Sequence, residues 1–380
     1  MFEKEKKQYR FLLIGRNLRM KMKLKKLLPL AGALFITTFT SAFANSNYSS
    51  NGNYGSATDS TSTQSGQQGA YQRGTFREIT PNAGPRVAHG ADVFITANFI
   101  WWKATQDGLR YATSGFGTDT TSGKTKSVGE DWAPGFKVGL GLNLSHDGWD
   151  LYAQYTWLHS SERNSIEAQQ ITPIFNVNET GQLITNKGRG KWNLHFNVVD
   201  LELGRNFYLS QFLTMRPFIG LKGTWQDQDT RFRFVNTANE NDFYRIHGDV
   251  DTWGVGVRGG FNLSYYIAKR WSIFGNFAWT TMWANYHELE RKDRESIADV
   301  VSTRVNIKND NFYTVKYVGE MELGLRWEIW FYDDNYHFAI QAGWEEQVWL
   351  NWGQFPAANQ QQVEHDLSLH GLNLKFRFDF

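Results

Sequence analysis

Two glutamates on one predicted strand, Glu320 and Glu322 of GEMELGLRWEI, are spaced as a catalytic carboxylate pair would be. Alternate residues of a strand point to the same face about 7 Å apart, which suits two carboxylates that share a proton. A strand face that borders water carries the same pattern, and this is the simpler interpretation. The pair therefore predicts an ionic face and does not by itself predict an enzyme.

Histidines are the other candidates for acid–base chemistry. Five of them fall near predicted turns or loops: His146, His159, His247, His287 and His337. The sequence has no His-Glu-x-x-His motif, no Gly-x-Ser-x-Gly elbow and no phosphate-binding glycine loop. It also has no cysteine, which excludes thiol chemistry and cysteine metal sites. We expect no catalytic residue, cofactor or metal, and an enzyme is the least favoured function.

The strands that carry these residues alternate between a polar and an apolar face. FKVGLGLNLS and WDLYAQYTW, joined at His146–Gly148, form a predicted hairpin. The polar faces hold both signs of charge together with amides and glycines, as expected of a water-filled or hydrogen-bonded interior. The residues predicted to line a pore are Lys137, Asp150, Asp200, Glu202, Arg216, Lys222, Arg258, Lys316, Glu320, Glu322, Arg326, Glu328, Glu345, Lys375 and Arg377, and Asp379 shares their face.

The apolar faces are bounded by aromatic rings. Trp149 and Trp157 are eight residues apart, as are Trp271 and Trp279, which corresponds to roughly 20 Å of height in a tilted strand. This is close to the apolar band of an outer-membrane β-barrel, where rings favour both rims. The predicted membrane girdle is Trp101, Trp149, Trp157, Trp192, Trp225, Trp253, Trp271, Trp279, Trp327, Trp344 and Phe380. A secreted β-sandwich is the disfavoured alternative.

The fold predicted is all-β: a transmembrane antiparallel β-barrel with short periplasmic turns and long extracellular loops. Short turns are expected near 146–148, 205–212, 267–270 and 332–336, and long polar loops near 113–132, 159–189, 226–251, 284–311 and 351–364. With both ends on the periplasmic side, this gives about ten strands. Twelve would result if a loop contained another hairpin, since RFRFV and DFYRI also alternate. The terminal strand HGLNLKFRFDF must close the barrel against VFITANFIWW.

The N-terminal region predicts export to the bacterial outer membrane. Residues 1–44 have a basic front, an apolar run and a small-x-small ending, as in a signal peptide whose true start is Met20 or Met22. Residues 45–76 are rich in Ser, Gly and Asn and predict a flexible leader before a barrel over 77–380. Removing 1–44 leaves 30 Lys/Arg against 36 Asp/Glu, a formal charge of −6, so nucleic-acid binding is not expected.

Several segments carry a family likeness. ADVFITANFIWWKATQDGLRYA, FKVGLGLNLSHDGWDLYAQYTWLH, NVVDLELGRNFYLSQFLTMRPFIGLKGTW and GLNLKFRFDF resemble the Legionella-type pore-forming major outer-membrane protein family, which also occurs in chlamydia-related bacteria. The resemblance runs from about Arg77 to Phe380. It implies a porin-like role. The terminal aromatic strand that ends in Phe380 resembles the signal by which outer-membrane proteins are recognised for insertion, which implies the assembly machinery as a partner. Because cysteine is absent, a disulfide-linked coat like that of the chlamydial proteins is not expected.

We therefore expect passive diffusion of small hydrophilic solutes through a narrow, weakly selective lumen. The alternative is a structural or adhesin-type barrel, in which paired lumen charges plug the bore and the long loops bind surfaces. The expected partners are outer-membrane lipid and lipopolysaccharide, and a homo-oligomer is compatible with the sequence. The transported solute, the state of the lumen and the ligand of the loops do not follow from the sequence.

Overall fold

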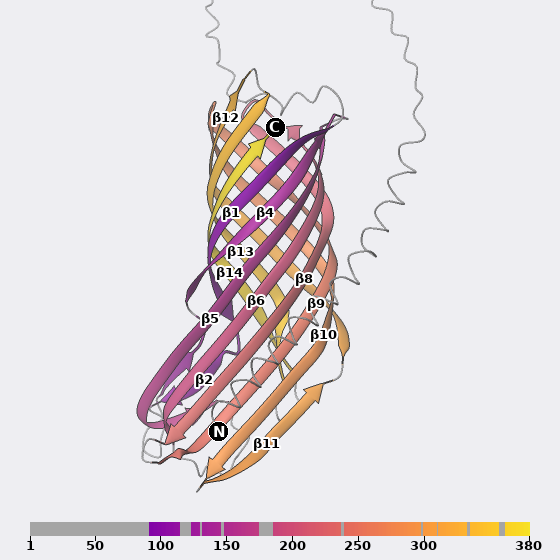
Figure 1. The fold of residues 1–380 in the computed structure, drawn as a ribbon. Coiled ribbons are helices and arrows are strands. Elements are labelled where there is room, and N and C mark those ends of the chain that lie inside the picture. The colour runs from indigo at the N-terminus through magenta and orange to yellow at the C-terminus, as the bar shows by residue number, and fades with distance from the viewer. Residues whose placement is uncertain are drawn as a thin grey trace, which may run out of the picture. The chain divides into compact units, whose positions relative to one another are not determined.

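A computed structural model describes residues 91–380 except 115–122, 130, 146–147, 175–184, 237–238, 298, 310, 333–334 and 357–361. The predicted signal peptide and leader, and His146 of the first predicted turn, lie outside these described residues. Ten long strands form a barrel (Figure 1). They are β1 (Ala91–Gln106), β4 (Trp132–Leu144), β5 (Trp149–Pro173), β6 (Thr185–Arg205), β8 (Leu213–Asn236), β9 (Asn239–Ala268), β10 (Trp271–Ile297), β12 (Phe312–Phe331), β13 (Tyr336–Pro356) and β14 (Gln362–Asp379).

The barrel closes where the last strand meets the first. β14 pairs antiparallel with β1 in an unbroken register from Phe94↔Asp379 to Gln106↔Leu367. Every other neighbouring pair is antiparallel as well, and β5–β6 completes the ring. Four short strands lie outside the ring: β2 (Arg110–Ser114), β3 (Lys124–Ser127), β7 (Phe207–Tyr208) and β11 (Val300–Asn309). The prediction of a closed, ten-stranded antiparallel barrel is confirmed. Among the described residues, no helix is long and apolar enough to cross a membrane.

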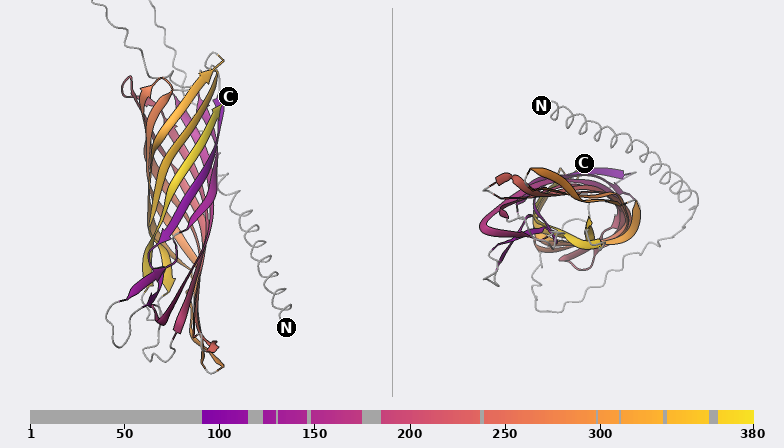
Figure 2. Two further views of the ribbon diagram at one scale, coloured as in Figure 1. Left: turned by 90° about the vertical axis from the view of Figure 1, so that its left-hand side faces the viewer. Right: turned by 90° about the horizontal axis from the view of Figure 1, so that it is seen from below.

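Most of the stretches predicted as long loops are strand. β9 has 30 residues and β10 has 27, far more than the 9–11 that cross a bilayer. RFRFV ends β8 and DFYRI begins β9, so they lengthen two barrel strands and add no hairpin. Figure 1 shows β8, β9, β10 and β11 continuing well beyond the closed ring at the end opposite the short turns, and Figure 2 shows the same extension from the side.

The outward side chains of the membrane-level strands are apolar and exposed, as lipid-facing residues must be. Among the predicted girdle residues, exposure reaches 50% at Trp271, 51% at Trp344 and 51% at Phe380. The prediction for Trp192 is wrong, since its side chain is fully buried in the barrel. Trp192 and Asp200 are eight residues apart on β6 and therefore point to the same side.

A β-bulge changes which residues of β10 face inward. The pairing of β10 with β9 shifts between Tyr286 and Glu288, so that one extra residue occupies β10 there. Before the bulge the even-numbered residues, such as Met282 and Ala284, are buried; after it the odd-numbered Leu289 and Arg291 are buried. The bulge thus changes the inward-facing residues of β10 from the even-numbered to the odd-numbered ones.

Candidate functional site

A cavity of about 490 Å³ occupies the half of the barrel interior next to the short turns. Its mouth is lined by residues at or beside those turns, among them Gly148, Asn206 and Tyr208. Its deepest residues are Asn98, Lys137 and Glu345, near mid-strand. In an outer-membrane barrel the short turns face the periplasm, so this cavity is a periplasmic vestibule.

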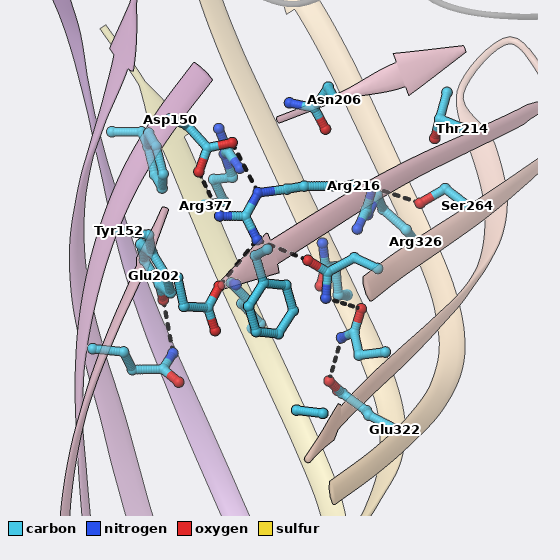
Figure 3. Close-up of a pocket in the computed structure, with 18 of the residues that line it drawn as sticks. Asp150, Tyr152, Glu202, Asn206, Thr214, Arg216, Ser264, Glu322, Arg326 and Arg377 are labelled. Carbon is cyan, nitrogen blue, oxygen red and sulfur yellow. Dashed lines mark hydrogen bonds and ion pairs between the residues drawn. The ribbon is translucent and has the colours of Figure 1, made fainter. Parts of the chain in front are cut away.

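Arg216 organises the outer part of the vestibule (Figure 3). Its guanidinium donates two hydrogen bonds to Asp150, at 2.8 and 2.5 Å. It donates a third to Glu202 at 3.0 Å and a fourth to the side-chain oxygen of Asn262 at 2.9 Å. Because β5, β6, β8 and β9 supply these four side chains, the cluster ties one wall of the barrel together. A guanidinium held this way is fixed in position.

A deeper layer of ion pairs crosses the bore. The Lys222 ammonium lies 2.7 Å from Asp200 and 2.9 Å from Glu320, with only 1% of its side chain exposed. Arg258 donates to Glu320 at 2.9 Å and to Glu202. On the opposite wall, Lys137 donates to both oxygens of Glu345, at 2.6 and 2.7 Å. These contacts form the ion layer: Lys137, Asp200, Glu202, Lys222, Arg258, Glu320 and Glu345.

Beyond the ion layer, packed aromatic rings fill the middle of the bore. Trp102, Phe196, Trp349, Trp352 and Tyr286 form a chain of ring contacts with centroid distances from 4.9 to 6.5 Å, and each is at most 1% exposed. We call these five residues the aromatic plug. They are part of a contiguous buried cluster that continues into the extension, so the plug is packed as a protein core is packed.

The plug fits tightly against both the ion layer and the barrel wall. The Lys137 ammonium lies 4.7 Å from the Trp102 ring centre and Lys222 lies 5.9 Å from that of Trp349, within the range of cation–π contacts. At Gly254 on β9, an added Cβ would lie only 2.5 Å from the sulfur of Met282 and 3.3 Å from the Trp352 ring. A glycine therefore makes room for the plug at that wall.

Thirteen of the fifteen predicted pore-lining residues line the vestibule: Lys137, Asp150, Asp200, Glu202, Arg216, Arg258, Glu320, Glu322, Arg326, Glu328, Glu345, Lys375 and Arg377. Asp379 does so as well. Lys222 lies between its two carboxylates in the ion layer. Lys316 lies over the Tyr286 ring at 5.7 Å and pairs with Glu364 at 3.2 Å, which places it on the far side of the plug.

The spacing of Glu320 and Glu322 does not produce a proton-sharing pair. Glu320 is engaged by Lys222 and Arg258, whereas Glu322 accepts hydrogen bonds from Asn276 at 2.8 Å and from Asn373 at 3.1 Å. Each carboxylate therefore has its own set of donors. Among the histidines, His337 lines the vestibule and lies 2.7 Å from Asp379.

The predicted pore lining named only charged residues, although the sequence also placed amides on the polar strand faces. Asn98, Tyr152, Gln154, Asn262, Asn276, Gln341 and Asn373 all line the vestibule. Asn373 is the most connected of them, because its amide donates to both Glu322 and Glu345. Strand parity places these residues on the same face as the charged ones, since they alternate with the lipid-facing residues.

The geometry is that of a vestibule open at one end. Small polar solutes can enter between the short turns and meet six basic and eight acidic side chains along its lining. The ion layer and then the aromatic plug block the way further. Among the described residues, the ion layer and the aromatic plug lie between the vestibule and the extension.

Comparison with known proteins gives a family. The sequence profile described as "Legionella pneumophila major outer membrane protein precursor" matches residues 85–380. No curated protein matches the chain significantly.

Several solved outer-membrane structures are similar in fold only. The Escherichia coli outer membrane protease OmpT is 10% identical with a TM-score of 0.37, over 76% of this chain and 97% of that one. A major outer membrane protein from Thermus thermophilus is 10% identical with a TM-score of 0.27, over 77% and 100%. The Pseudomonas putida toluene transporter TodX is 9% identical with a TM-score of 0.28, over 79% and 95%. At these values none of the three bears on function.

Proposed function

Because the chain belongs to the Legionella major outer membrane protein family, we propose that this outer-membrane β-barrel is a porin-type protein that its aromatic plug holds closed at rest. Small hydrophilic solutes would cross only while the plug is displaced. The observation that carries the proposal is the vestibule, which has the mixed ionic lining of a solute path and ends against packed rings. No reaction is part of the proposal, since the buried carboxylates of the ion layer are engaged by cations.

Openings of the channel should be rare, and the open channel should discriminate only weakly between cations and anions. Displacing Trp349 and its neighbours would open the apolar cluster, which costs several kcal/mol for each large side chain that leaves its packed site. The vestibule lining has two more acidic than basic side chains, which favours small cations slightly. Screening by salt should weaken this preference.

Single-channel recording in planar bilayers tests the proposal. We expect the purified protein to give infrequent steps, and Trp349→Ala to raise the frequency of opening at least tenfold. Trp344→Ala is the matched control, because Trp344 lies on the same strand but 51% exposed on the lipid face. If folded Trp349→Ala protein stays as silent as the control, the plug is not a gate and the proposal is wrong.

A second candidate function is a permanently closed barrel that binds surfaces through its extracellular part. The observation in its favour is the depth of the apolar cluster, which extends from the ion layer to Phe232, Phe234 and Tyr244 in the extension. Such a core suits a rigid platform better than a path for solutes. Silence of both the native protein and the Trp349→Ala variant would support this candidate.

A further inference from the structure

Four arginines stand side by side on the outer face of the extension. Arg189 of β6 pairs in register with Arg233 of β8, Arg233 with Arg245 of β9, and Arg245 with Arg294 of β10. All four are exposed. Neighbouring strands are about 4.8 Å apart, so this arginine row spans roughly 14 Å across the strands.

The arginine row is electrostatically costly. Like charges directly opposite each other on a sheet destabilise it, and three such pairs follow one another here. Burial, together with Arg233 and Arg294, lowers the pKa of Arg245. Among the described residues, no carboxylate lies within ion-pair distance of the four guanidiniums. The row is compensated only at its Arg189 end, where the Glu167 carboxylate lies within electrostatic range. A row of like charges with so little compensation is what a binding surface for an anion requires.

An aromatic ring holds part of the row in place. Phe243 lies on the same face two residues before Arg245, with its ring centre 4.2 Å from the Arg245 guanidinium and 5.9 Å from that of Arg233. Stacking restrains a guanidinium while its N–H donors stay available. Phe243 therefore restrains Arg245, and more weakly Arg233, while their N–H donors stay available to a ligand.

A second basic row lies beside the first, on the side toward the membrane. It consists of Arg163, Lys191, Arg231, His247 and Lys292, which are in register across five strands. Here Arg231 pairs with Asp229 at 2.7 Å and Lys292 with Glu290 at 3.4 Å. This row is partly neutralised, so the arginine row is the stronger site for an anion.

Acidic rows separate both basic rows from the membrane. Asp227, Asp251 and Glu288 are in register nearest the girdle, and Asp229, Asp249 and Glu290 follow. Arg233 is eight residues beyond Trp225 on β8, which is roughly 20 Å above the girdle. Lipid phosphates lie near girdle height, where these carboxylates would repel them. The arginine row therefore stands clear of the level of the lipid phosphates.

We propose that the arginine row binds a linear polysaccharide that carries sulfate or phosphate groups. A flat sheet cannot enclose a small anion, and a single small anion would meet only one or two of the four arginines. An extended polyanion that lies across the strands can present one oxyanion after another to successive guanidiniums, which hold such groups bidentately. This binding is independent of whether the aromatic plug opens.

Binding of dextran sulfate to the intact protein in detergent micelles tests the proposal, with neutral dextran and phosphatidylglycerol vesicles as the comparison probes. The test variant is Arg233→Ser/Arg245→Ser. The matched control is Arg304→Ser/Lys308→Ser, which removes the same charge from the same end of the barrel. Arg304 and Lys308 are already paired with Glu295 and Glu290.

We expect dextran sulfate to bind at least tenfold tighter than neutral dextran, with affinity that falls as salt rises. Arg233→Ser/Arg245→Ser should weaken this binding at least tenfold, and the control variant should weaken it less than threefold. Equal losses in both variants would mean that only net charge matters and would overturn the proposal. So would a failure to bind dextran sulfate, or a preference for the anionic vesicles.

Discussion

Replacing Lys222 with methionine should destabilise the barrel strongly. The ammonium lies 2.7 Å from Asp200 and 2.9 Å from Glu320, with 1% of the lysine side chain and less than a tenth of each carboxylate exposed. Lys222→Met removes one of the two cations that these buried carboxylates share and leaves Arg258, which lies 2.9 Å from Glu320 and 3.7 Å from Asp200. Removing one partner from a buried ion pair costs about 3–5 kcal/mol, and we expect a loss in this range in the free energy of unfolding.

A double variant shows how much of the destabilisation by Lys222→Met comes from the unbalanced buried charge and how much from the changed packing. Lys222→Met/Glu320→Gln removes one charge of each sign, and the glutamine oxygen can still accept a hydrogen bond from Arg258. We expect the double variant to recover all but about 1–2 kcal/mol, because removing a buried pair as a unit is often nearly neutral. A cycle with the single variants then gives the coupling energy of Lys222 and Glu320.

The assay is equilibrium unfolding in urea of the protein in lipid vesicles, followed by tryptophan fluorescence. Lys292→Met is the control, because its pair with Glu290 at 3.4 Å is solvent-exposed and such pairs contribute about 0–1 kcal/mol. If Lys222→Met cost no more than Lys292→Met, the Lys222 ammonium would not behave as a buried charge. Our account of the ion layer around Lys222 would then be wrong.

Two further predictions concern the extension and its boundary with the membrane. Trp192→Ala should cost about 3–5 kcal/mol in the same unfolding assay, because its fully buried ring leaves a cavity, whereas Trp271→Ala on the lipid face should cost clearly less. The rings of His159 and His195 stack at 4.1 Å just outside the girdle, and burial lowers the pKa of both. The unfolded chain therefore takes up protons first as the pH falls through about 6.5, so stability should decline below that pH, and His159→Gln/His195→Gln should flatten the decline.

The alternating pattern predicted the membrane part of the barrel because a single rule holds there. At membrane level the residues that face lipid are apolar and those that face the vestibule are polar. The alternation along each strand was therefore enough to assign Lys137, Arg216 and Glu345 to the interior. The pairs that close the bore could not be predicted, because they join strands that are far apart in sequence. Lys137 and Glu345, for example, are 208 residues apart.

Beyond the girdle the outward face of the strands is charged and the inward face is largely aromatic, the opposite of the arrangement at membrane level. This is why the long loops and the position of Trp192 were predicted wrongly. In RFRFV the arginines face water while Phe232 and Phe234 are buried in the barrel. A charged outer face and an aromatic inner face are normal for a sheet in water, but the same segment looks like a polar loop when every apolar residue is assigned to lipid. Trp192 was placed in the girdle for the same reason. Whether an apolar residue of a strand faces lipid or the barrel interior therefore depends on how far along the strand it lies.

The bulge at His287 limits how the length of β10 can change. Deleting one residue there would reverse the facing of every position after it, turning Arg294 toward the barrel interior and Leu289 toward water. The row of four guanidiniums would then be broken at its last member. Insertions or deletions in the outer half of this strand should therefore involve two residues at a time, because only an even number leaves the inward and outward residues on their own faces.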